Sequence, residues 1–440
     1  MKDSGVDWIG EVPLDWEITK IKFKYDVILG KMVQPEQNDE SDFRVSYFKA
    51  KNIQEGYIRK DFEEMYVNKA DIKKYEIKSG DVLVCEGGDV GRAVVCKNDY
   101  PNMVIQNSLH RVRGKKQNDV RLIYHYLYMI RKYGFMDVMV NRATIAHFTK
   151  EKFDNLDFII SPVYEEQTKI ANFLDDKISQ LDAIIEKSRA SIEKLQAYRK
   201  SVIYEAVTKG LDKTAPMKDS GVKWIGESPV GWRVSRFKYE VSTPITDGPH
   251  ETPELVDVGI PFASAESIKN GIIDLNFIRG YISEKDHRQF SKKVRPQRDD
   301  IYIVKSGAGT GKSGIVITDE VFDIWSPLAL IRTCPTVNYQ KYFFHFINSE
   351  TFVKQVENRW SYGTQQNIGM NVLEDLYVTV PPITDQKSIA DYLDTKTNEI
   401  DAAINKLNQL IQTTEKTKKS IIYEYVTGKK RVPEFNTGGV

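Results

Sequence analysis

The feature that most constrains this chain is a long heptad pattern that occurs twice. Between Pro162 and Thr208, mostly apolar residues recur at alternating steps of four and three, and the pattern returns 219 residues later, so that Leu174 corresponds to Leu393. This spacing keeps one stripe of an α-helix, the seam, facing a partner helix. The first predicted seam consists of Leu174, Ile178, Leu181, Ile185, Ser188, Ile192, Leu195, Arg199, Val202 and Ala206. The second consists of Leu393, Thr397, Ile400, Ile404, Leu407, Ile411, Thr414, Lys418, Ile421 and Tyr425.

Each pattern predicts one continuous helix that needs a partner, because a helix cannot bury its own apolar stripe. Prolines precede both segments and glycines follow them, which places the two helices within residues 161–210 and 381–428. Such a helix spans roughly 65 Å, at about 1.5 Å per residue. Because the two copies share one chain, each is at high effective concentration for the other. We therefore expect two long antiparallel coiled-coil helices that separate two globular regions, with an internal pseudo-two-fold repeat.

The rest of the chain is duplicated as well. Met217 begins a segment that repeats the opening Met-Lys-Asp-Ser-Gly-Val sequence, with Trp8 and Trp16 matched by Trp224 and Trp232. We expect these tryptophans to anchor short turns that are rich in glycine and proline.

A region of mixed character follows in each copy, at residues 17–160 and 233–380. Short β-like runs alternate with turn residues and helical segments, which predicts an α+β fold with two α/β globular domains. The predicted strands are Asp81–Val84, Ala93–Val95, Ile301–Val304 and Ile315–Ile317, and the predicted helices are Val120–Tyr133 and Tyr339–Asn358. The expected domains are an N-terminal segment plus globule (1–160), a helix (161–210), a linker plus second globule (211–380), a second helix (381–428) and a tail (429–440).

Composition narrows the class of protein. The chain has 440 residues, 41% hydrophobic and 28% charged, as expected for a globular protein of two to four domains. No apolar run approaches the ~20 residues of a membrane helix, and the N-terminal segment carries acid without an apolar core. The three cysteines, Cys85, Cys96 and Cys334, form no Cys-x-x-Cys pair, which supports neither a zinc site nor a disulfide framework. These features predict a cytoplasmic protein.

The net charge of +1 argues against a protein that coats DNA by charge alone, because such proteins are usually far more basic. It allows a DNA reader with local basic patches that shares the DNA with other subunits.

One segment resembles a phosphate-binding loop. Residues 306–313 read Ser-Gly-Ala-Gly-Thr-Gly-Lys-Ser, but the Walker pattern requires glycine in place of Ser306. The matching stretch of the first copy, residues 86–92, carries Asp89 and no Lys-Ser pair. The second loop also leads into a predicted strand, whereas a phosphate cradle opens a helix. We therefore predict a glycine-rich hairpin loop that lets the backbone approach a ligand such as DNA.

The sequence contains no recognisable catalytic arrangement. Residues 161–164, Ser-Pro-Val-Tyr, nearly match the tetrad of amino-methyltransferases, but their counterpart at 380–383 lacks the aromatic residue and no glycine-rich methyl-donor loop follows a strand. The six histidines show no metal-ligand spacing, and no nucleophile and base can be paired. We expect no catalytic residues, no metal site and no cofactor bound by this chain.

Polar and basic residues in loops recur at equivalent places in both copies. Asn, Gln, Arg and Lys make the bidentate contacts to base edges that each contribute ~1–3 kcal/mol of discrimination. In the first copy the predicted DNA-contacting residues are Lys49, Lys51, Asn52, Arg92, Gln106, Asn107, His110, Arg142, Thr144 and His147. In the second copy they are Thr246, Asp247, His250, Ser264, Lys312, Tyr362, Thr364, Gln365, Gln366 and Asn367.

Together these features resemble the specificity subunit of type I restriction–modification enzymes. The resemblance rests on Lys-Asp-Ser-Gly-x-x-Trp-Ile-Gly-Glu-x-Pro from Lys2, on Gln-x-x-Ile-Ala at Gln167 and Gln386, and on Asp247-Gly248-x-His250. It covers nearly the whole chain. It implies two target recognition domains, each of which reads one half of a bipartite, asymmetric site in double-stranded DNA.

The resemblance also implies partners. The helices would set the spacing and bind two modification (methyltransferase) subunits, and two restriction subunits would join for translocation and cleavage. S-adenosylmethionine, ATP and Mg would then be bound by the partner subunits. Two other classes stay open: an ATPase that uses the Lys312 loop, and a coiled-coil scaffold without a role on DNA.

Overall fold

The structure is a computed structural model that describes residues 1–115, 117–136, 148–307, 309–359 and 367–432. The chain divides into two compact units. Unit 1 comprises Met1–Ser188 and Asn408–Val440, and unit 2 comprises Arg189–Leu407. Each unit therefore contains one globular region together with half of each long helix.

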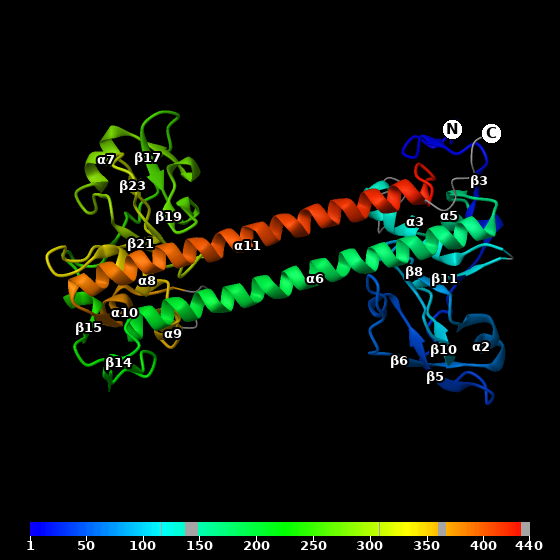
Figure 1. Cartoon of the computed structure of the whole chain (residues 1–440), viewed down its shortest axis with the longest axis horizontal. Coiled ribbons are helices and arrows are strands. Elements are labelled where there is room, and N and C mark those ends of the chain that lie inside the picture. Colours follow the sequence, from blue (N-terminus) through cyan, green and yellow to red (C-terminus); the bar gives the residue numbers. More distant parts are fainter. Residues whose placement is uncertain (116, 137–147, 308, 360–366, 433–440) are drawn as a thin grey trace. The chain divides into compact units, whose positions relative to one another are not determined.

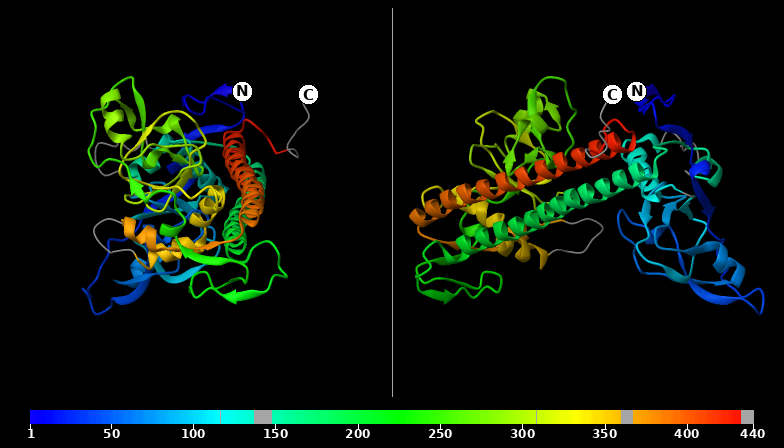
Figure 2. Two further views of the ribbon diagram at one scale, coloured as in Figure 1. Left: turned by 90° about the vertical axis from the view of Figure 1, so that its left-hand side faces the viewer. Right: turned by 45° about the vertical axis from the view of Figure 1, so that its right-hand side comes forward.

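The two long helices are α6 (Tyr164–Lys209) and α11 (Ile383–Val426). Within each unit, a half of α6 lies beside a half of α11 (Figures 1 and 2). In unit 1 the Phe173 ring lies 4.4 Å from the Tyr425 ring, and further along Asp182 pairs with Lys418. In unit 2 the end of α6 packs with the start of α11 in one apolar cluster. The pairing is thus antiparallel in both units, and each predicted seam residue is buried or half-buried.

Unit 1 holds two four-stranded sheets, β6-β5-β10-β7 and β4-β11-β8-β9, and two two-stranded pairs, β1-β2 and β12-β3. Its strands are β1 (Lys2–Asp3), β2 (Glu11–Val12), β3 (Glu17–Lys20), β4 (Tyr25–Leu29), β5 (Phe43–Phe48), β6 (Glu63–Val67), β7 (Glu76–Ile77), β8 (Val82–Cys85), β9 (Ala93–Val95), β10 (Tyr100–Ile105), β11 (Leu109–Gly114) and β12 (Asp157–Ile160). Its short helices are α1 (Ile21–Lys24), η1 (Ala50–Asn52), α2 (Lys69–Tyr75), α3 (Val120–Lys132) and α5 (Lys150–Asp154).

Unit 2 holds a six-stranded sheet, β16-β24-β21-β22-β19-β18, a three-stranded sheet, β20-β17-β23, and the pairs β13-β14 and β15-β25. Its strands are β13 (Met217–Asp219), β14 (Glu227–Pro229), β15 (Arg233–Arg236), β16 (Thr246–Asp247), β17 (Ile260–Ala263), β18 (Ile268–Lys269), β19 (Ile272–Ile273), β20 (Gly280–Ile282), β21 (Ile301–Val304), β22 (Ser313–Ile315), β23 (Asp323–Ile324), β24 (Leu328–Ile331) and β25 (Tyr377–Val380). Its short helices are η2 (Phe237–Tyr239), η3 (Ala265–Ser267), η4 (Leu275–Phe277), α7 (Glu284–Phe290), α8 (Gln340–Ile347), α9 (Glu350–Glu357) and α10 (Met370–Asp375).

The two units repeat one topology. The order β4-β11-β8-β9 in unit 1 recurs as β16-β24-β21-β22 in unit 2, and β6-β5-β10 recurs as β20-β17-β23. The predicted α+β fold, with two globular regions and two long antiparallel helices, is confirmed. Two details differ. The strand predicted over Ile315–Ile317 is β22, which covers Ser313–Ile315 and ends where the prediction begins. The helix predicted over Tyr339–Asn358 is two helices, because the Ser349 hydroxyl accepts a hydrogen bond from the Phe352 amide and starts a new helix.

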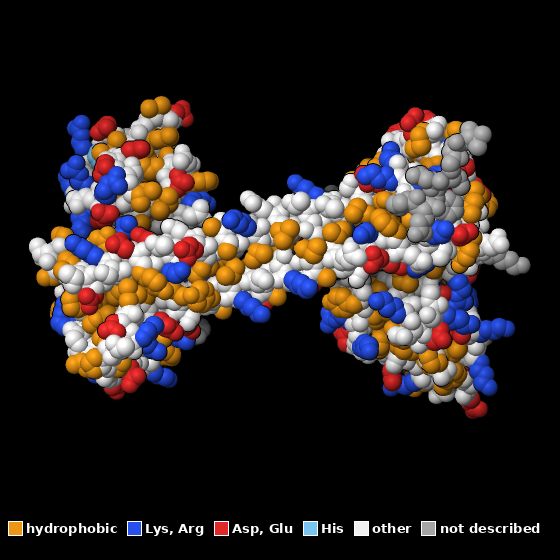
Figure 3. All heavy atoms as spheres, viewed as in Figure 1, with side chains coloured by type: hydrophobic (Ala, Val, Ile, Leu, Met, Phe, Trp, Pro, Cys, Tyr) orange, Lys and Arg blue, Asp and Glu red, His pale blue; other side chains and the backbone are white. Residues whose placement is uncertain are grey.

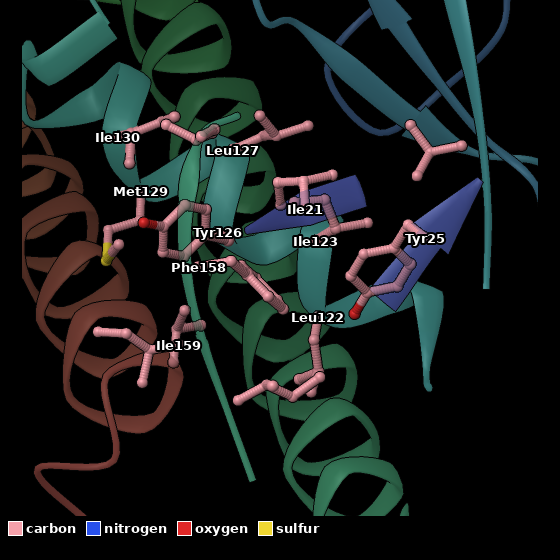
Figure 4. Close-up of a cluster of buried hydrophobic side chains, with 14 of the residues drawn as sticks. Ile21, Tyr25, Leu122, Ile123, Tyr126, Leu127, Met129, Ile130, Phe158 and Ile159 are labelled. Atoms are coloured by element: carbon pink, nitrogen blue, oxygen red, sulfur yellow. The ribbon is translucent and has the colours of Figure 1, made fainter. Parts of the chain in front are cut away.

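Each unit has its own apolar core. In unit 1 the core lies between α3 and the sheets, and the labelled side chains in Figure 4 point toward one another from α1, α3, β12 and the start of β4. The Phe158 ring is fully buried and lies 5.0 Å from the ring of Tyr126 and 5.5 Å from that of Tyr25. The matched tryptophans Trp16 and Trp232 are buried as well, as the turn prediction expects.

A repeated set of polar contacts fixes each globule to the start of the long helix that follows it. The buried Gln167 side chain accepts a hydrogen bond from the Asp119 amide, at the start of α3, at 2.9 Å. Gln386 accepts one from the Tyr339 amide, at the start of α8, at 2.7 Å. Eight residues further along each helix, Asp175 and Asp394 accept from buried histidines of α3 and α8 at 3.0 and 2.8 Å. The Gln-x-x-Ile-Ala motif therefore has a structural role in orienting the globules.

Candidate nucleic-acid interface

The two sheets of each unit meet where a glycine follows β4 or β16. The Gly30 amide donates to the Leu109 carbonyl at 3.0 Å, and the Gly248 amide donates to the Leu328 carbonyl at 3.4 Å. A Cβ atom at Gly30 would lie 2.4 Å from the Gln106 carbonyl oxygen, and one at Gly248 would lie 2.3 Å from the Ile324 carbonyl oxygen. Only glycine allows this close approach of two backbone segments. The two glycines are therefore equivalent points at which the sheets are joined.

Three further chain segments meet at the same place. In unit 1 the Glu86 amide donates to Ser108 at 2.9 Å, and the Glu86 carbonyl accepts from the Phe148 amide at 2.7 Å. In unit 2 Lys305 makes the same two bonds: its amide donates to the Pro327 carbonyl at 2.8 Å, and its carbonyl accepts from the Ile368 amide at 2.7 Å. Three segments thus converge in each unit. In unit 1 they are the hairpin loop after β8, the turn before β11 and the segment before α5. In unit 2 they are the hairpin loop after β21, the turn before β24 and the segment before α10. We refer to this place in each unit as the loop edge.

Charges at the loop edge of unit 2 are organised by Asp247. Its buried carboxylate pairs with Lys293 and Lys305, both at 2.6 Å, and lies 3.2 Å from His250. Burial alone would raise the pKa of Asp247, but hydrogen bonds from the two lysines lower it below its ordinary value. The carboxylate therefore stays ionised and holds the two ammonium groups in place, while the His250 side chain is 70% exposed.

Charges near the loop edge of unit 1 are organised by Glu63, on β6. Its carboxylate accepts hydrogen bonds from the Lys49 ammonium group, from the Tyr47 hydroxyl at 2.9 Å and from the Lys51 ammonium group at 3.1 Å. The bonds from Lys49, Tyr47 and Lys51 lower the pKa of Glu63 to about 2. The half-exposed Lys49 and the exposed Lys51 are thus held in place beside the turn formed by η1.

Burial removes four residues from the predicted set of DNA contacts. One is Asp247, which is 6% exposed and whose carboxylate is occupied by Lys293 and Lys305. Asn52 is fully buried, and its amide nitrogen donates to the carbonyls of Arg59 and Asp61 at 3.1 and 3.3 Å. His110 is fully buried, and its Nε2 lies 2.7 Å from the Phe148 carbonyl. Burial also lowers the pKa of His110.

Ser264 is 4% exposed, and its hydroxyl donates to Glu266 at 3.1 Å beside η3. These four side chains shape the loops and cannot reach DNA from the outside. The predictions for Asn52, His110, Asp247 and Ser264 as DNA-contacting residues are therefore corrected.

Several other predicted residues lie at or beside the loop edges. The Arg92 guanidinium donates to the Ala50 carbonyl at 3.0 Å, and the Gln106 amide donates to the Asn107 side chain at 2.6 Å. Asn367 is exposed and forms a β-bridge with Ser306. Thr246 is half-buried at the start of β16, and Lys312 is exposed. The predictions for Arg142, Thr144, His147, Tyr362, Thr364, Gln365 and Gln366 lie outside the described residues.

The Lys312 loop joins two antiparallel strands. β21 pairs with β22, and the Lys312 amide donates to the Gly309 carbonyl at 3.0 Å just before β22 begins. The prediction of a hairpin loop that leads into a strand is confirmed. No helix starts within the described part of this loop, residues 305–307 and 309–312, so these amides lack the helix N-terminus of a phosphate cradle.

Two other features are absent from the described residues. They contain no group of three or more His, Cys, Asp or Glu side chains placed to hold a metal ion. None of the described helices is long and apolar enough to cross a membrane.

Comparison with known proteins decides the family. A family model described as the Type I restriction modification DNA specificity domain matches residues 13–194 and 249–413. The chain belongs to this family.

Individual members resemble the chain over most of its length. It is 24% identical over 438 residues to the Type I restriction enzyme MjaVIII specificity subunit of Methanocaldococcus jannaschii. The alignment covers 97% of this chain and 95% of that protein. It is 21% identical over 424 residues to the EcoKI specificity subunit of Escherichia coli K12, with coverage of 92% and 88%.

Two solved structures share the fold. One, described as "Structural basis underlying complex assembly and conformational transition of the type I R-M system", gives a TM-score of 0.69 at 12% identity and covers 96% of this chain and all of that one. The HsdS subunit of Thermoanaerobacter tengcongensis gives a TM-score of 0.53 at 12% identity, with coverage of 96% and 98%. The resemblance to specificity subunits that the sequence motifs indicate is confirmed.

Sequence reasoning missed several residues at the loop edges of this specificity subunit. Glu63, Lys293 and Lys305 were not predicted, although each forms an ion pair with a predicted residue. The available signal was weak: Lys305 directly follows a buried strand, where loop-edge residues are expected, but nothing in the sequence pairs Lys293 with Asp247.

Proposed function

We propose that this chain is the DNA sequence-recognition subunit of a type I restriction–modification complex, in which each unit reads one half of a bipartite, asymmetric site in double-stranded DNA. The observation that carries the proposal is the repeated loop edge. Both units build it from the same backbone contacts, including the close approach at Gly30 and Gly248. Two domains that recognise different half-sites require the same backbone arrangement with different side chains at the DNA-facing positions.

The chemistry of the two edges supports an asymmetric site. Glu86 in unit 1 occupies the backbone position of Lys305 in unit 2, so an acid replaces a base at equivalent points. Likewise, Gln106 follows β10 where Trp325 follows β23. Side chains that differ in charge and hydrogen-bonding groups select different base pairs.

We propose that α6 and α11 act as the spacer between the half-sites. Two ion pairs related by the repeat support a fixed register: Lys418 with Asp182 at 2.7 Å, and Arg199 with Asp401 at 3.1 Å. Polar pairs within an apolar seam oppose sliding, because any other register would leave the charges unpaired.

We further propose that the exposed surface of the helices binds two modification subunits. Figure 3 shows hydrophobic side chains on the visible face of the helices, and Ile184, Tyr198, Tyr392 and Leu410 are all exposed. Exposed apolar side chains on helices favour contact with partner helices. In this proposal the chain itself is non-catalytic, and S-adenosylmethionine, ATP and Mg are bound by the modification subunits and two restriction subunits.

A domain exchange tests the proposal. Residues 17–160 are replaced by the matching region of a specificity subunit with a different target, and the chain is assembled with its modification subunits. Mapping of methylated adenines is expected to show one half-site changed and the other half-site retained. A change in both half-sites, or in neither, would contradict independent reading by the two units. If the unaltered complex retards no duplex DNA in a sequence-specific way, the scaffold alternative is favoured.

A further inference from the structure

An arginine stacked on a tryptophan lies beside the loop edge of unit 2. Arg279 directly precedes β20, and its guanidinium carbon lies 3.9 Å from the centre of the Trp325 ring. The Arg279 amide donates to the Phe262 carbonyl at 3.0 Å, and the Trp325 amide donates to the Ala263 carbonyl at 2.9 Å. Backbone bonds to β17 therefore fix both partners, and the stack is preorganised.

The tryptophan belongs to the loop edge itself. The carbonyl carbon of Trp325 would lie 2.6 Å from a Cβ atom at Gly248, and the next residue, Ser326, donates to the Pro249 carbonyl at 3.2 Å. The indole nitrogen of Trp325 is buried without a hydrogen-bond partner among the described residues. An unpaired buried N–H destabilises the fold, so this ring is not explained by stability alone.

Arg279 is exposed, and no described carboxylate forms an ion pair with it. In the same unit, Arg298 and Arg332 each pair with an aspartate at 2.6 Å. A stacked guanidinium has one face covered, while the N–H groups along its rim stay available in the plane. Two parallel N–H donors on a planar fork match the O6 and N7 acceptors of guanine in the major groove.

We propose that Arg279, held by Trp325, reads a guanine in the half-site recognised by unit 2. This inference rests on the proposed DNA-recognition function and assigns it a base and a residue. The repeat confines the contact to one half-site. The residue of unit 1 that precedes β6, as Arg279 precedes β20, is Phe62, and Gln106 takes the place of Trp325. Unit 1 therefore has no stacked arginine at this place.

The test uses the full chain assembled with its modification subunits and a library of duplexes randomised over the recognised site. Methylated sequences are read out for the unaltered complex and for Arg279→Ala, Arg279→Lys and the control Arg298→Ala. Arg298 is also exposed, but it precedes β21, at the end of that strand opposite Lys305. The unaltered complex is expected to require guanine at one position of one half-site.

Arg279→Ala is expected to lower the preference for that guanine by roughly 5- to 150-fold while the other positions keep theirs. Arg279→Lys is expected to restore little of it, because an ammonium group cannot form the planar double contact. Arg298→Ala is expected to leave the sequence preference unchanged.

Two results would overturn the inference while the proposed function stands. One is an unchanged guanine requirement in Arg279→Ala. The other is uniformly weaker methylation of all sequences by Arg279→Ala with full rescue by Arg279→Lys, which identifies a phosphate contact. If the unaltered complex shows no sequence preference, the proposed function itself fails, and the inference fails with it.

Discussion

The spacer proposal makes a quantitative prediction about lengthening the long helices. Seven residues that continue the heptad pattern are inserted after Ser188 in α6 and after Leu407 in α11, the points at which the two units divide. Inserting one heptad in both helices keeps the seam in phase, because seven residues fall only ~20° short of two full turns. The ion pairs of Asp182 with Lys418 and of Arg199 with Asp401 each stay within one unit.

The added length follows from helix geometry. Seven residues at about 1.5 Å each lengthen both helices by roughly 10 Å. With about 3.4 Å per base pair, the gap between half-sites is expected to grow by about three base pairs. The half-site sequences are expected to stay the same, since no loop-edge residue changes.

The assay is mapping of methylated adenines by the complex of the lengthened chain with its modification subunits. A matched control inserts two residues at each of the same points, which rotates the two ends of each helix by roughly 200° and turns the seam away from its partner. This control is expected to lose sequence-specific methylation. A lengthened chain that methylates with the original gap would refute the idea that the helices set the spacing.

Three further predictions concern single residues. Gly248→Ala is expected to abolish reading by unit 2 and to lower the free energy of unfolding by about 1–3 kcal/mol, because its Cβ would lie 2.3 Å from a backbone oxygen. Gly231→Ala, whose Cβ would have nothing within 4 Å, serves as the neutral control. Thermal unfolding and methylation maps check both variants, and normal reading by Gly248→Ala would contradict the prediction. Asp182→Ala is expected to destabilise unit 1, because it leaves the ammonium group of Lys418, a residue only 8% exposed, without its carboxylate. Adding Lys418→Met is expected to recover most of the lost stability, as measured by urea unfolding. Equal losses of stability in the single and double variants would argue against this reasoning. The pKa of Glu63 is lowered to about 2, so its stabilising contribution is complete above about pH 4.5 and is lost as the pH falls toward 2. Glu63→Gln is expected to remove this part of the dependence of stability on acid pH. Identical profiles of stability against pH for the two proteins would refute this prediction.

Local patterns in the sequence were sufficient for the long helices and for the repeat. The seam could be predicted because helical periodicity is a property of neighbouring residues, and Arg199 and Lys418 could be placed on it by number alone. The same holds for the hairpin around residues 306–312, which the counterpart loop and the following strand identify. What periodicity could not give is the partner of each seam charge, since Lys418 pairs with a residue 236 positions away.

The sequence by itself determined the duplicated frame, the two helices and the family, because these depend on spacing and on motifs that neighbouring residues carry. Only the tertiary structure decided which polar residues face outward at the loop edges. Asn52 and His110 are as polar as any DNA-contacting residue, yet both are fully buried, while Arg279 is exposed and stacked on Trp325. The physical reason is that burial and pairing depend on residues far apart in the chain, which pack together only after the sheets have formed.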